Sequence, residues 1–438
     1  MELKLLPSAP STGAGSRRPV LGAAWILSVC SLWIACSGVT HKAPTIDSAP
    51  KAETRIILVS LDGFRWDFAG RVDTPNLDRL ANAGIRAEKL LAAFPTKTFP
   101  NHYTLVTGLW PSNHGIVGNN IRDPELEARF GLGNREAVAD GRWWGGEPIW
   151  VTAEKQGVKS APLFWPGSEA PIKGVRPTYW EPYQHEMSNA DRVDKLLSWI
   201  DLPEADRPRF LTLYASDVDS AAHDSNPDSS PDVAAAVARV DAMVGRLLAG
   251  LEQRGLADST HVIIVSDHGM SATSADRVIP IDDYIDLEVA NPMDMGAILT
   301  LWPEPEDEET VYTALKGAHP RLAVYRRDEI PARLHFADSP RIAPIVGVVD
   351  DGWSASTRGR LENSPERFEG GSHGYDPDLD SMGGLFIAHG PALRQGLVVE
   401  PFRNIHLYEL MCHVLGLEPA KNDGDLGVVR EMLRQPGE

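Results

Sequence analysis

The stretch RIILVSLDG, residues 55–63, decides the fold class. Its β-branched and aliphatic residues form a short, unbroken apolar run, which is typical of a strand buried on both faces of a parallel sheet. Asp62 follows this run directly. The next regular segment, TPNLDRLANAG at residues 74–84, predicts a helix with Thr74 as its N-cap and Gly84 just after its end. A buried strand followed by a helix indicates an α/β fold.

Two further apolar runs end in polar side chains. PRFLTLYASDVD, residues 208–219, carries Asp219 just beyond its run, and THVIIVSDHG, residues 260–269, ends in Asp267 and His268. The carboxyl ends of parallel strands meet at one edge of an open α/β sheet, and ligands bind at that edge. We therefore expect the polar side chains that follow all three runs to lie close together.

The rest of the chain continues the α/β pattern with one interruption. Residues 230–255 predict a long helix whose apolar side chains share one face, and residues 383–392 predict a further strand. Residues 279–365 contain prolines, an acidic run and short strand-like pieces, which predict a smaller inserted α+β lobe. We expect one catalytic domain over residues 54–430 and a short tail over residues 431–438.

The N-terminal segment, residues 1–36, predicts an exported protein. Basic residues precede the apolar run VLGAAWILSVCSLWIA at residues 20–35, which is too short to favour a spanning helix. Ala35 precedes Cys36, as in a lipoprotein signal whose cysteine becomes lipidated. Residues 37–53 then predict a polar linker. We expect a periplasmic protein or a membrane-anchored lipoprotein that touches the membrane only through Cys36.

The charge balance excludes one class of partner. Acidic residues number 61 and basic residues 42, which gives a net charge of -19. Such a surface is not suited to neutralising many nucleic-acid phosphates, so we expect no stable nucleic-acid binding. A substrate that carries phosphate would then need local cations, which bound metal ions can supply.

The expected cluster at the strand ends has the chemistry of a metal site. Its candidate ligands are Asp62, Asp219, His223, Asp267, His268 and His373. Asp219 and His223 lie four residues apart, so one helical turn brings both to the same face. Carboxylate and imidazole groups suit zinc better than manganese or other transition ions. A single aspartate after a strand is more often a turn former, but six groups at separate strand ends fit two metal ions.

The stretch TKTFPNHYTLVTG, residues 96–108, leads into an apolar helix. Thr96 or Thr98 could act as the N-cap of this helix. A threonine at a helix N-terminus beside a divalent cation could instead act as a nucleophile, because both features stabilise an alkoxide. The residue pattern leaves the two threonines and the two roles open.

Seven motifs in order resemble the ectonucleotide pyrophosphatase/phosphodiesterase family of the alkaline phosphatase superfamily. They are LVSLDGFRWD, FPTKTFPNHYTLVTGLWPSNHGIVGNN, GEPIW, FWPGS, DVDSAAH, VIIVSDHGM and GGSHGYD. The resemblance covers roughly residues 54–430. It implies an alkaline-phosphatase-like three-layer α/β fold, with a mostly parallel central sheet flanked by helices and a smaller inserted lobe. It also implies a bacterial-type member built on this single catalytic domain.

The resemblance implies two zinc ions per chain and assigns their ligands. One zinc would be surrounded by Asp62, Thr98, Asp267 and His268, and the second would be held by Asp219, His223 and His373. Thr98 would be the nucleophile, because zinc lowers the pKa of its hydroxyl. Its attack on phosphorus would form a threonine-linked intermediate that water then hydrolyses.

The resemblance also assigns the residues that would bind the substrate. Asn119 would donate a hydrogen bond to a phosphate oxygen, and as an uncharged group it would favour diesters and pyrophosphates over monoesters. The base would stack on Phe99, Tyr183 and Tyr214, with Trp165 and Glu169 nearby. Flat aromatic side chains suit any base, so we expect tolerance among nucleotides.

These observations predict an exported, zinc-dependent nucleotide pyrophosphatase/phosphodiesterase. Nucleotide or dinucleotide substrates would yield nucleoside 5'-monophosphates. The alternative enzyme is a phospholipid phosphodiesterase of the same fold that acts on choline headgroups. The aromatic residues of FWPGSEAPIKGVRPTYWEPY, residues 164–183, favour nucleotides. A metal-binding protein without turnover is a third possibility, and it is disfavoured because no expected ligand or nucleophile is missing.

Overall fold

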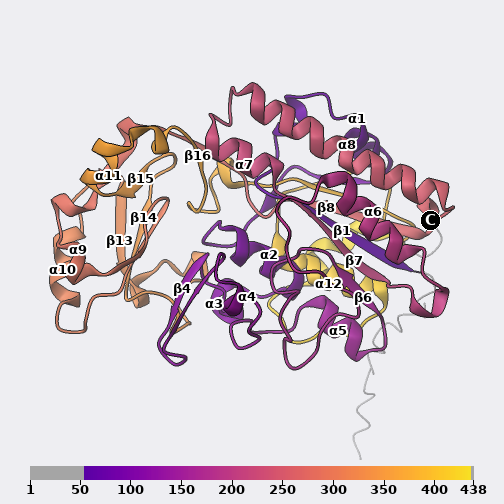
Figure 1. The fold of residues 1–438 in the computed structure, drawn as a ribbon, viewed down its shortest axis with the longest axis horizontal. Helices are drawn as coiled ribbons and strands as arrows, with labels where there is room; N and C mark the ends of the chain where they lie inside the picture. The colour runs from indigo at the N-terminus through magenta and orange to yellow at the C-terminus, as the bar shows by residue number, and fades with distance from the viewer. Residues whose placement is uncertain (1–53, 436–438) are drawn as a thin grey trace, which may run out of the picture. The chain divides into compact units, whose positions relative to one another are not determined.

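The structure is a computed structural model that describes residues 54–435 of the chain (Figure 1). The predicted signal segment and linker, with Cys36, lie outside the described residues, as do residues 436–438. Among residues 54–435, no helix has both the length and the apolar character needed to cross a membrane.

A seven-stranded sheet forms the centre of the fold, with the strand order β18-β2-β17-β8-β1-β7-β6. These strands are β1 (Arg55–Leu61), β2 (Ile85–Ala87), β6 (Ser160–Pro162), β7 (Phe210–Ala215), β8 (Thr260–Val265), β17 (Phe386–His389) and β18 (Leu397–Val399). Strand β1 pairs in parallel with β7 on one side and with β8 on the other. β17 runs antiparallel to both of its neighbours. The three strands that carry the candidate ligands are therefore adjacent and end at the same edge, as predicted.

Helices cover both faces of this sheet (Figure 1). Ile57 and Val59 of β1 pack into the apolar core shared with α1 (Pro75–Ala83), α6 (Asn189–Ile200) and α8 (Pro231–Gln253). Ile56 and Leu58 face the opposite core, shared with α2 (Thr98–Thr107), α5 (Ile149–Lys155) and α12 (Leu407–Leu415). Burial on alternate faces explains why β1 is apolar at every position. The two helices predicted from the sequence are present as α1 and α8.

The inserted lobe, residues 279–365, has a sheet and a core of its own (Figure 1). Its antiparallel sheet contains β11 (Pro292–Asp294), β12 (Ile298–Leu301), β14 (Ile345–Val349) and β13 (Leu322–Arg326). Three helices, α9 (Leu287–Ala290), α10 (Glu308–Leu315) and α11 (Arg358–Asn363), belong to the same segment. The acidic run provides the first turn of α10, where Glu308 and Glu309 complement the helix dipole.

Shorter elements position the candidate site and close the remaining edges. They are β3 (Leu90–Leu91), α3 (Pro111–His114), β4 (Asn120–Asp123), β5 (Ala128–Gly131), α4 (Arg135–Val138), α7 (Asp217–Asp224), β9 (Ser271–Thr273), β10 (Val278–Pro280), β15 (Ser354–Ser356), β16 (Gly370–Ser372), β19 (Phe402–Arg403) and α13 (Leu426–Val429). Strand β16 pairs with β9, and β10 pairs with β15 of the inserted lobe. These pairings connect the end of β8 to the lobe.

Candidate metal centre and substrate cavity

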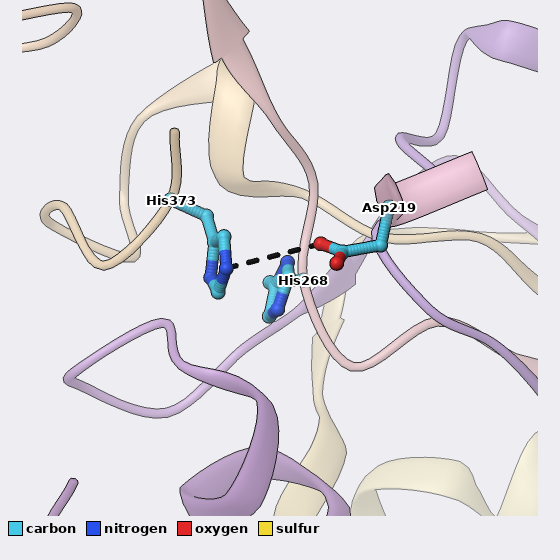
Figure 2. Close-up of side chains that lie close together, drawn as sticks. All are labelled: Asp219, His268 and His373. Atoms are coloured by element: carbon cyan, nitrogen blue, oxygen red, sulfur yellow. Dashed lines mark ion pairs between the residues drawn. The ribbon is translucent and has the colours of Figure 1, made fainter. Parts of the chain in front are cut away.

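The predicted ligands meet at the carboxyl edge of the central sheet. Asp62 follows β1, Asp267 and His268 follow β8, Asp219 lies in the first turn of α7, and His373 follows β16. Two groups of three side chains place one ligand atom each within 4.8 Å of the others. They are Asp62, Asp267 and His268, and Asp219, His268 and His373. Figure 2 shows the second group.

Short distances connect these side chains into one cluster. His268 Nε2 lies 2.9 Å from Asp267 Oδ2 and 3.6 Å from Asp62 Oδ1. The rings of His268 and His373 stack with centroids 3.6 Å apart (Figure 2). Asp219 Oδ1 lies 3.8 Å from His373 Nε2. His268 therefore borders both groups, although the family resemblance assigns it to one ion.

The side chain of His223 extends the cluster from the end of α7. Its Nε2 lies 3.5 Å from Asp219 Oδ1, and its ring centroid lies 5.1 Å from that of His373. This geometry follows from the four-residue spacing along one helical turn. All six candidate Asp and His ligands therefore lie in one cluster at the carboxyl edge of the central sheet.

Backbone carbonyl groups orient the three histidines. Nδ1 lies 2.9 Å from Gly371 O in His223 and 2.9 Å from Gly269 O in His268. In His373, Nδ1 lies 2.7 Å from the carbonyl oxygen of Thr96. Because a carbonyl oxygen only accepts hydrogen bonds, each Nδ1 carries the proton and donates it. Each Nε2 in the neutral ring then has a free lone pair, as a metal ligand requires.

Several buried polar atoms in this cluster have no hydrogen-bond partner within the described part of the chain. They are Asp62 Oδ1, Asp219 Oδ1, Asp267 Oδ2 and His268 Nε2, and the last two face each other as an ion pair at 2.9 Å without the geometry of a hydrogen bond. A buried polar atom without a partner costs about 1–3 kcal/mol, and more if it is charged. Divalent cations bound at the two groups would coordinate these atoms, so the side chains fit metal ions. The oxygen and nitrogen donors suit zinc.

The pKa values of the cluster also indicate that its carboxylates need a nearby positive charge. Burial raises the pKa of Asp62 well above its usual value, and repulsion from Asp267 and Asp219 raises it further. Burial would lower the pKa of His268, but the Asp267 carboxylate raises it to about 9. In the absence of metal, the cluster therefore keeps protons to limit repulsion. A bound cation would take over that role.

Thr98 is the first residue of α2, so neither Thr96 nor Thr98 takes the N-cap position that the residue pattern had left open to them. Lys97 occupies the N-cap position without a capping hydrogen bond. The amide of Phe99, which a capping side chain would normally bind, donates instead to Asn119 Oδ1 at 3.0 Å. A side chain from another segment therefore caps this helix. Its hydrogen bond leaves the Nδ2 amide of Asn119 available to a ligand.

The structure also separates the two candidate threonines. The buried Thr96 hydroxyl donates to Tyr375 O at 3.0 Å and accepts from the amide of Gly374 at 2.9 Å. Thr98 instead lines the cavity beside the cluster. Thr96 therefore supports the His373 loop, whereas Thr98 is open to the cavity.

A cavity of about 380 Å³ adjoins the cluster. Its walls contain all six residues predicted to contact the substrate, which are Phe99, Asn119, Trp165, Glu169, Tyr183 and Tyr214. The walls also contain residues predicted for the metal site, which are Asp62, Thr98, Asp219, His223 and His373. Asp267 and His268 do not line it. The volume lies within the range of about 300–1,000 Å³ for small-molecule sites.

Some of the predicted cavity residues also form hydrogen bonds with neighbouring residues. The Tyr214 hydroxyl donates to Asp62 Oδ2 at 2.6 Å, which orients that carboxylate. The indole nitrogen of Trp165 donates to the carbonyl oxygen of His102 at 2.9 Å. Glu169 accepts from the amide of Tyr183 at 3.1 Å. Trp165 and Tyr214 therefore support the metal side of the cavity.

The sequence interpretation missed several residues that line the cavity, among them Leu132, Arg135 and Phe164. Leu132 is 45% exposed, and Arg135 forms an ion pair with Glu169. Phe164 belongs to the FWPGS motif, so the motif could have identified it. Leu132 and Arg135 lie in a region where no residue pattern indicated a site.

His102 connects the nucleophile segment to the metal cluster. Its Nδ1 lies 2.8 Å from the carbonyl oxygen of Thr98 and 3.3 Å from Asp267 Oδ2. Nδ1 therefore carries the proton, and Nε2 accepts from the Ser60 hydroxyl at 2.8 Å. One fully buried imidazole thus fixes the positions of Thr98 and Asp267 relative to β1.

We expect His102→Leu to lower kcat by about 10- to 100-fold with a smaller change in KM, as for other residues that orient metal ligands. His102→Asn should recover part of the loss, because its side-chain amide can still donate a hydrogen bond. His114→Leu is the matched control, since His114 is equally buried and bonds to Thr104 Oγ1 at 3.0 Å. Steady-state kinetics with metal content measured on each sample would check this. Equal losses in His102→Leu and His114→Leu would contradict the positioning role.

The architecture and the cluster together define a class. A mostly parallel sheet between two helical layers, with carboxylates and imidazoles at the strand ends and an inserted α+β lobe, is an alkaline-phosphatase-like fold.

Comparison with known proteins identifies the family within this class. Residues 56–376 match the family described as type I phosphodiesterase / nucleotide pyrophosphatase. The chain is 38% identical over 392 residues to ectonucleotide pyrophosphatase/phosphodiesterase family member 3 of Rattus norvegicus, covering 87% of this chain and 44% of that protein. It is 36% identical over 382 residues to family member 5 of Homo sapiens, covering 87% and 78%. The chain belongs to this family.

A solved structure shares the fold. Murine ectonucleotide pyrophosphatase/phosphodiesterase 5, as an inactive threonine-to-alanine variant in complex with AMP, superposes with a TM-score of 0.82 at 37% identity. The match covers 87% of this chain and 100% of that one. The chain spans about half the length of the first curated relatives that it matches.

Proposed function

We propose that the protein is a zinc-dependent hydrolase of nucleotide pyrophosphate and phosphodiester bonds that releases nucleoside 5'-monophosphates. The observation that carries the proposal is the group of buried, unpartnered Asp and His atoms beside a cavity lined by Thr98 and aromatic side chains. The family membership and the AMP complex of the murine relative support a nucleotide as the bound group.

Each residue then has a defined task. Two zinc ions, held as the resemblance assigns them, would supply positive charge to the substrate phosphate and to the Thr98 hydroxyl. Thr98 Oγ forms the new bond to phosphorus while the bond to the leaving oxygen breaks, and water later releases the nucleotide from Thr98. The Nδ2 amide of Asn119 donates to a non-bridging oxygen. Phe99 and Tyr183 hold the base.

The site should discriminate between diesters and monoesters. Arg135, the cationic side chain in the cavity wall, is paired with Glu169, and Asn119 is uncharged. A monoester dianion would therefore meet less positive charge than its free oxygens need. We expect kcat/KM for p-nitrophenyl-TMP to exceed that for p-nitrophenyl phosphate by at least about 10-fold, a difference of ~1.4 kcal/mol. Faster turnover of the monoester would contradict the proposal.

The same substrate panel tests the choline-headgroup alternative. Lysophosphatidylcholine offers a trimethylammonium group and an acyl chain in place of a base. The aromatic walls and the Arg135–Glu169 ion pair suit a planar base with polar edges. Turnover of lysophosphatidylcholine above that of ATP would reverse the assignment.

Export and the lipid anchor belong to the proposal as well. Both depend on residues 1–36, and several relatives are named as ectoenzymes or venom proteins. Mass spectrometry of the native N-terminus tests this point. A mature protein that begins at a lipid-modified Cys36 is the expected result, and an unprocessed N-terminus would contradict it.

A further inference from the structure

A second, larger groove adjoins the metal cluster at His223. It has a volume of about 680 Å³ and is lined by His223 at the end of α7 and by Arg360, Arg367 and Phe368 of the segment around α11. His223 also lines the catalytic cavity. The side chain of His223 is 39% exposed, so the two spaces meet at this candidate ligand.

The groove contains cationic side chains that the fold does not use. Within residues 54–435, the guanidinium groups of Arg360 and Arg367 form no ion pair or hydrogen bond, and both side chains are exposed. Arg358, on the same helix as Arg360, instead pairs with Asp283 and Glu362. Two unpaired arginines in one groove favour a ligand that carries phosphate.

Other side chains of the groove limit what that ligand can be. Asp224, Glu366 and Glu369 also line it, and Glu369 accepts a hydrogen bond from the amide of Ala275 at 3.0 Å. The groove therefore has three carboxylates against two guanidinium groups and does not suit a long polyanion, so a phosphate would have to bind at the arginines themselves. Phe368 is half-buried and offers a surface for a base.

The position of the groove relative to Thr98 indicates which part of a substrate the groove would bind. In an in-line displacement, the entering and leaving oxygens lie on opposite sides of phosphorus, and a two-metal site stabilises both. With Thr98 entering, the leaving group departs toward Asp219, His223 and His373. The groove begins at His223 on that side.

We propose that this groove is a leaving-group subsite that binds the departing nucleoside monophosphate of pyrophosphate-linked dinucleotides. This assignment rests on the proposed function, because it requires Thr98 to be the entering group. Arg360 and Arg367 contact the departing phosphate, and Phe368 packs against its base. The inserted lobe and the segment that follows it thereby select substrates with a nucleotide on both sides of the pyrophosphate.

Binding to a protein that cannot turn over tests the subsite directly. In the Thr98→Ala background, Arg360→Ala/Arg367→Ala should raise the Kd of diadenosine diphosphate by about 10-fold, because two charge-assisted contacts are lost. The Kd of AMP should change less than two-fold, because AMP occupies the catalytic cavity. Arg358→Ala is the matched control and should change neither Kd. Isothermal titration calorimetry would measure all of them.

Turnover gives an independent measurement. In the protein that retains Thr98, the double arginine variant should lose about 10-fold in kcat/KM for diadenosine diphosphate and keep its value for p-nitrophenyl-TMP, whose leaving group does not reach the groove. An unchanged dinucleotide Kd, or equal losses for both substrates, would overturn the subsite alone. Absence of AMP binding and of turnover in the wild-type protein would instead overturn the proposed function.

Discussion

Replacing Thr98 with alanine is expected to lower kcat for p-nitrophenyl-TMP by at least about 10⁴-fold, as removal of a nucleophile does in other covalent hydrolases. The variant loses the oxygen that bonds to phosphorus, while Asn119, the aromatic walls and most ligands of the cluster remain. AMP binding should therefore persist. Stopped assays with product separation would measure the residual rate, and calorimetry would measure AMP binding.

Two substitutions control this result. Thr98→Ser keeps a hydroxyl and should keep measurable turnover. Thr107→Ala removes a hydroxyl from the same helix, one that donates to Tyr103 O at 2.7 Å away from the cavity, and should keep nearly full activity. Turnover by a folded Thr98→Ala protein at the wild-type rate would exclude a threonine-linked intermediate.

Removing metal is the second change with a large expected effect. Chelation with EDTA should abolish turnover, and added zinc should restore it. It should also lower stability, because a cation that binds only the folded state contributes about 4 kcal/mol when present at 1,000 times its Kd. The physical source is the set of buried, unpartnered atoms of Asp62, Asp219, Asp267 and His268. Thermal unfolding and metal analysis on the same samples would measure both effects.

The chelation experiment needs a control for effects outside the cluster. An Asp62→Asn/Asp267→Asn variant loses two carboxylates of one ligand group, so its metal content should fall. Chelation should then change its unfolding temperature less than that of the wild type. Full activity after chelation would contradict a metal-dependent mechanism, and rescue by manganese but not zinc would change the metal assigned.

Local sequence patterns predicted much of the fold correctly. The apolar runs at β1, β7 and β8 predicted three parallel strands, and their adjacency followed from the general rule for ligand sites in α/β sheets. The helix signals around α1 and α8 also gave their boundaries closely. The antiparallel direction of β17 could not be predicted, because strand direction depends on how the chain returns across the sheet and leaves no pattern within the strand.

The site residues could be predicted where the residue spacing or a sequence motif indicated their role. Asp219 and His223 followed from a helical turn, and His373 was a candidate ligand in the glycine-rich motif GGSHGYD, although the resemblance alone assigned it to one of the two ions. The cap of α2 could not be decided from the sequence, because Asn119, which lies about 20 residues further along the chain, supplies the acceptor for the amide of Phe99. Leu132 and Arg135 were missed for a similar reason, since only the tertiary fold brings them to the cavity.

The carbonyl groups that hold His223, His268 and His373 have a consequence for how this site tolerates mutation. Many metal-binding histidines are oriented by carboxylate side chains, which a single codon change can remove. Here the acceptors belong to the main chain of Gly371, Gly269 and Thr96, and every amino acid carries that oxygen. No side-chain substitution removes these acceptors. Each histidine should therefore keep its proton on Nδ1 in sequence variants whose loops keep the same backbone conformation.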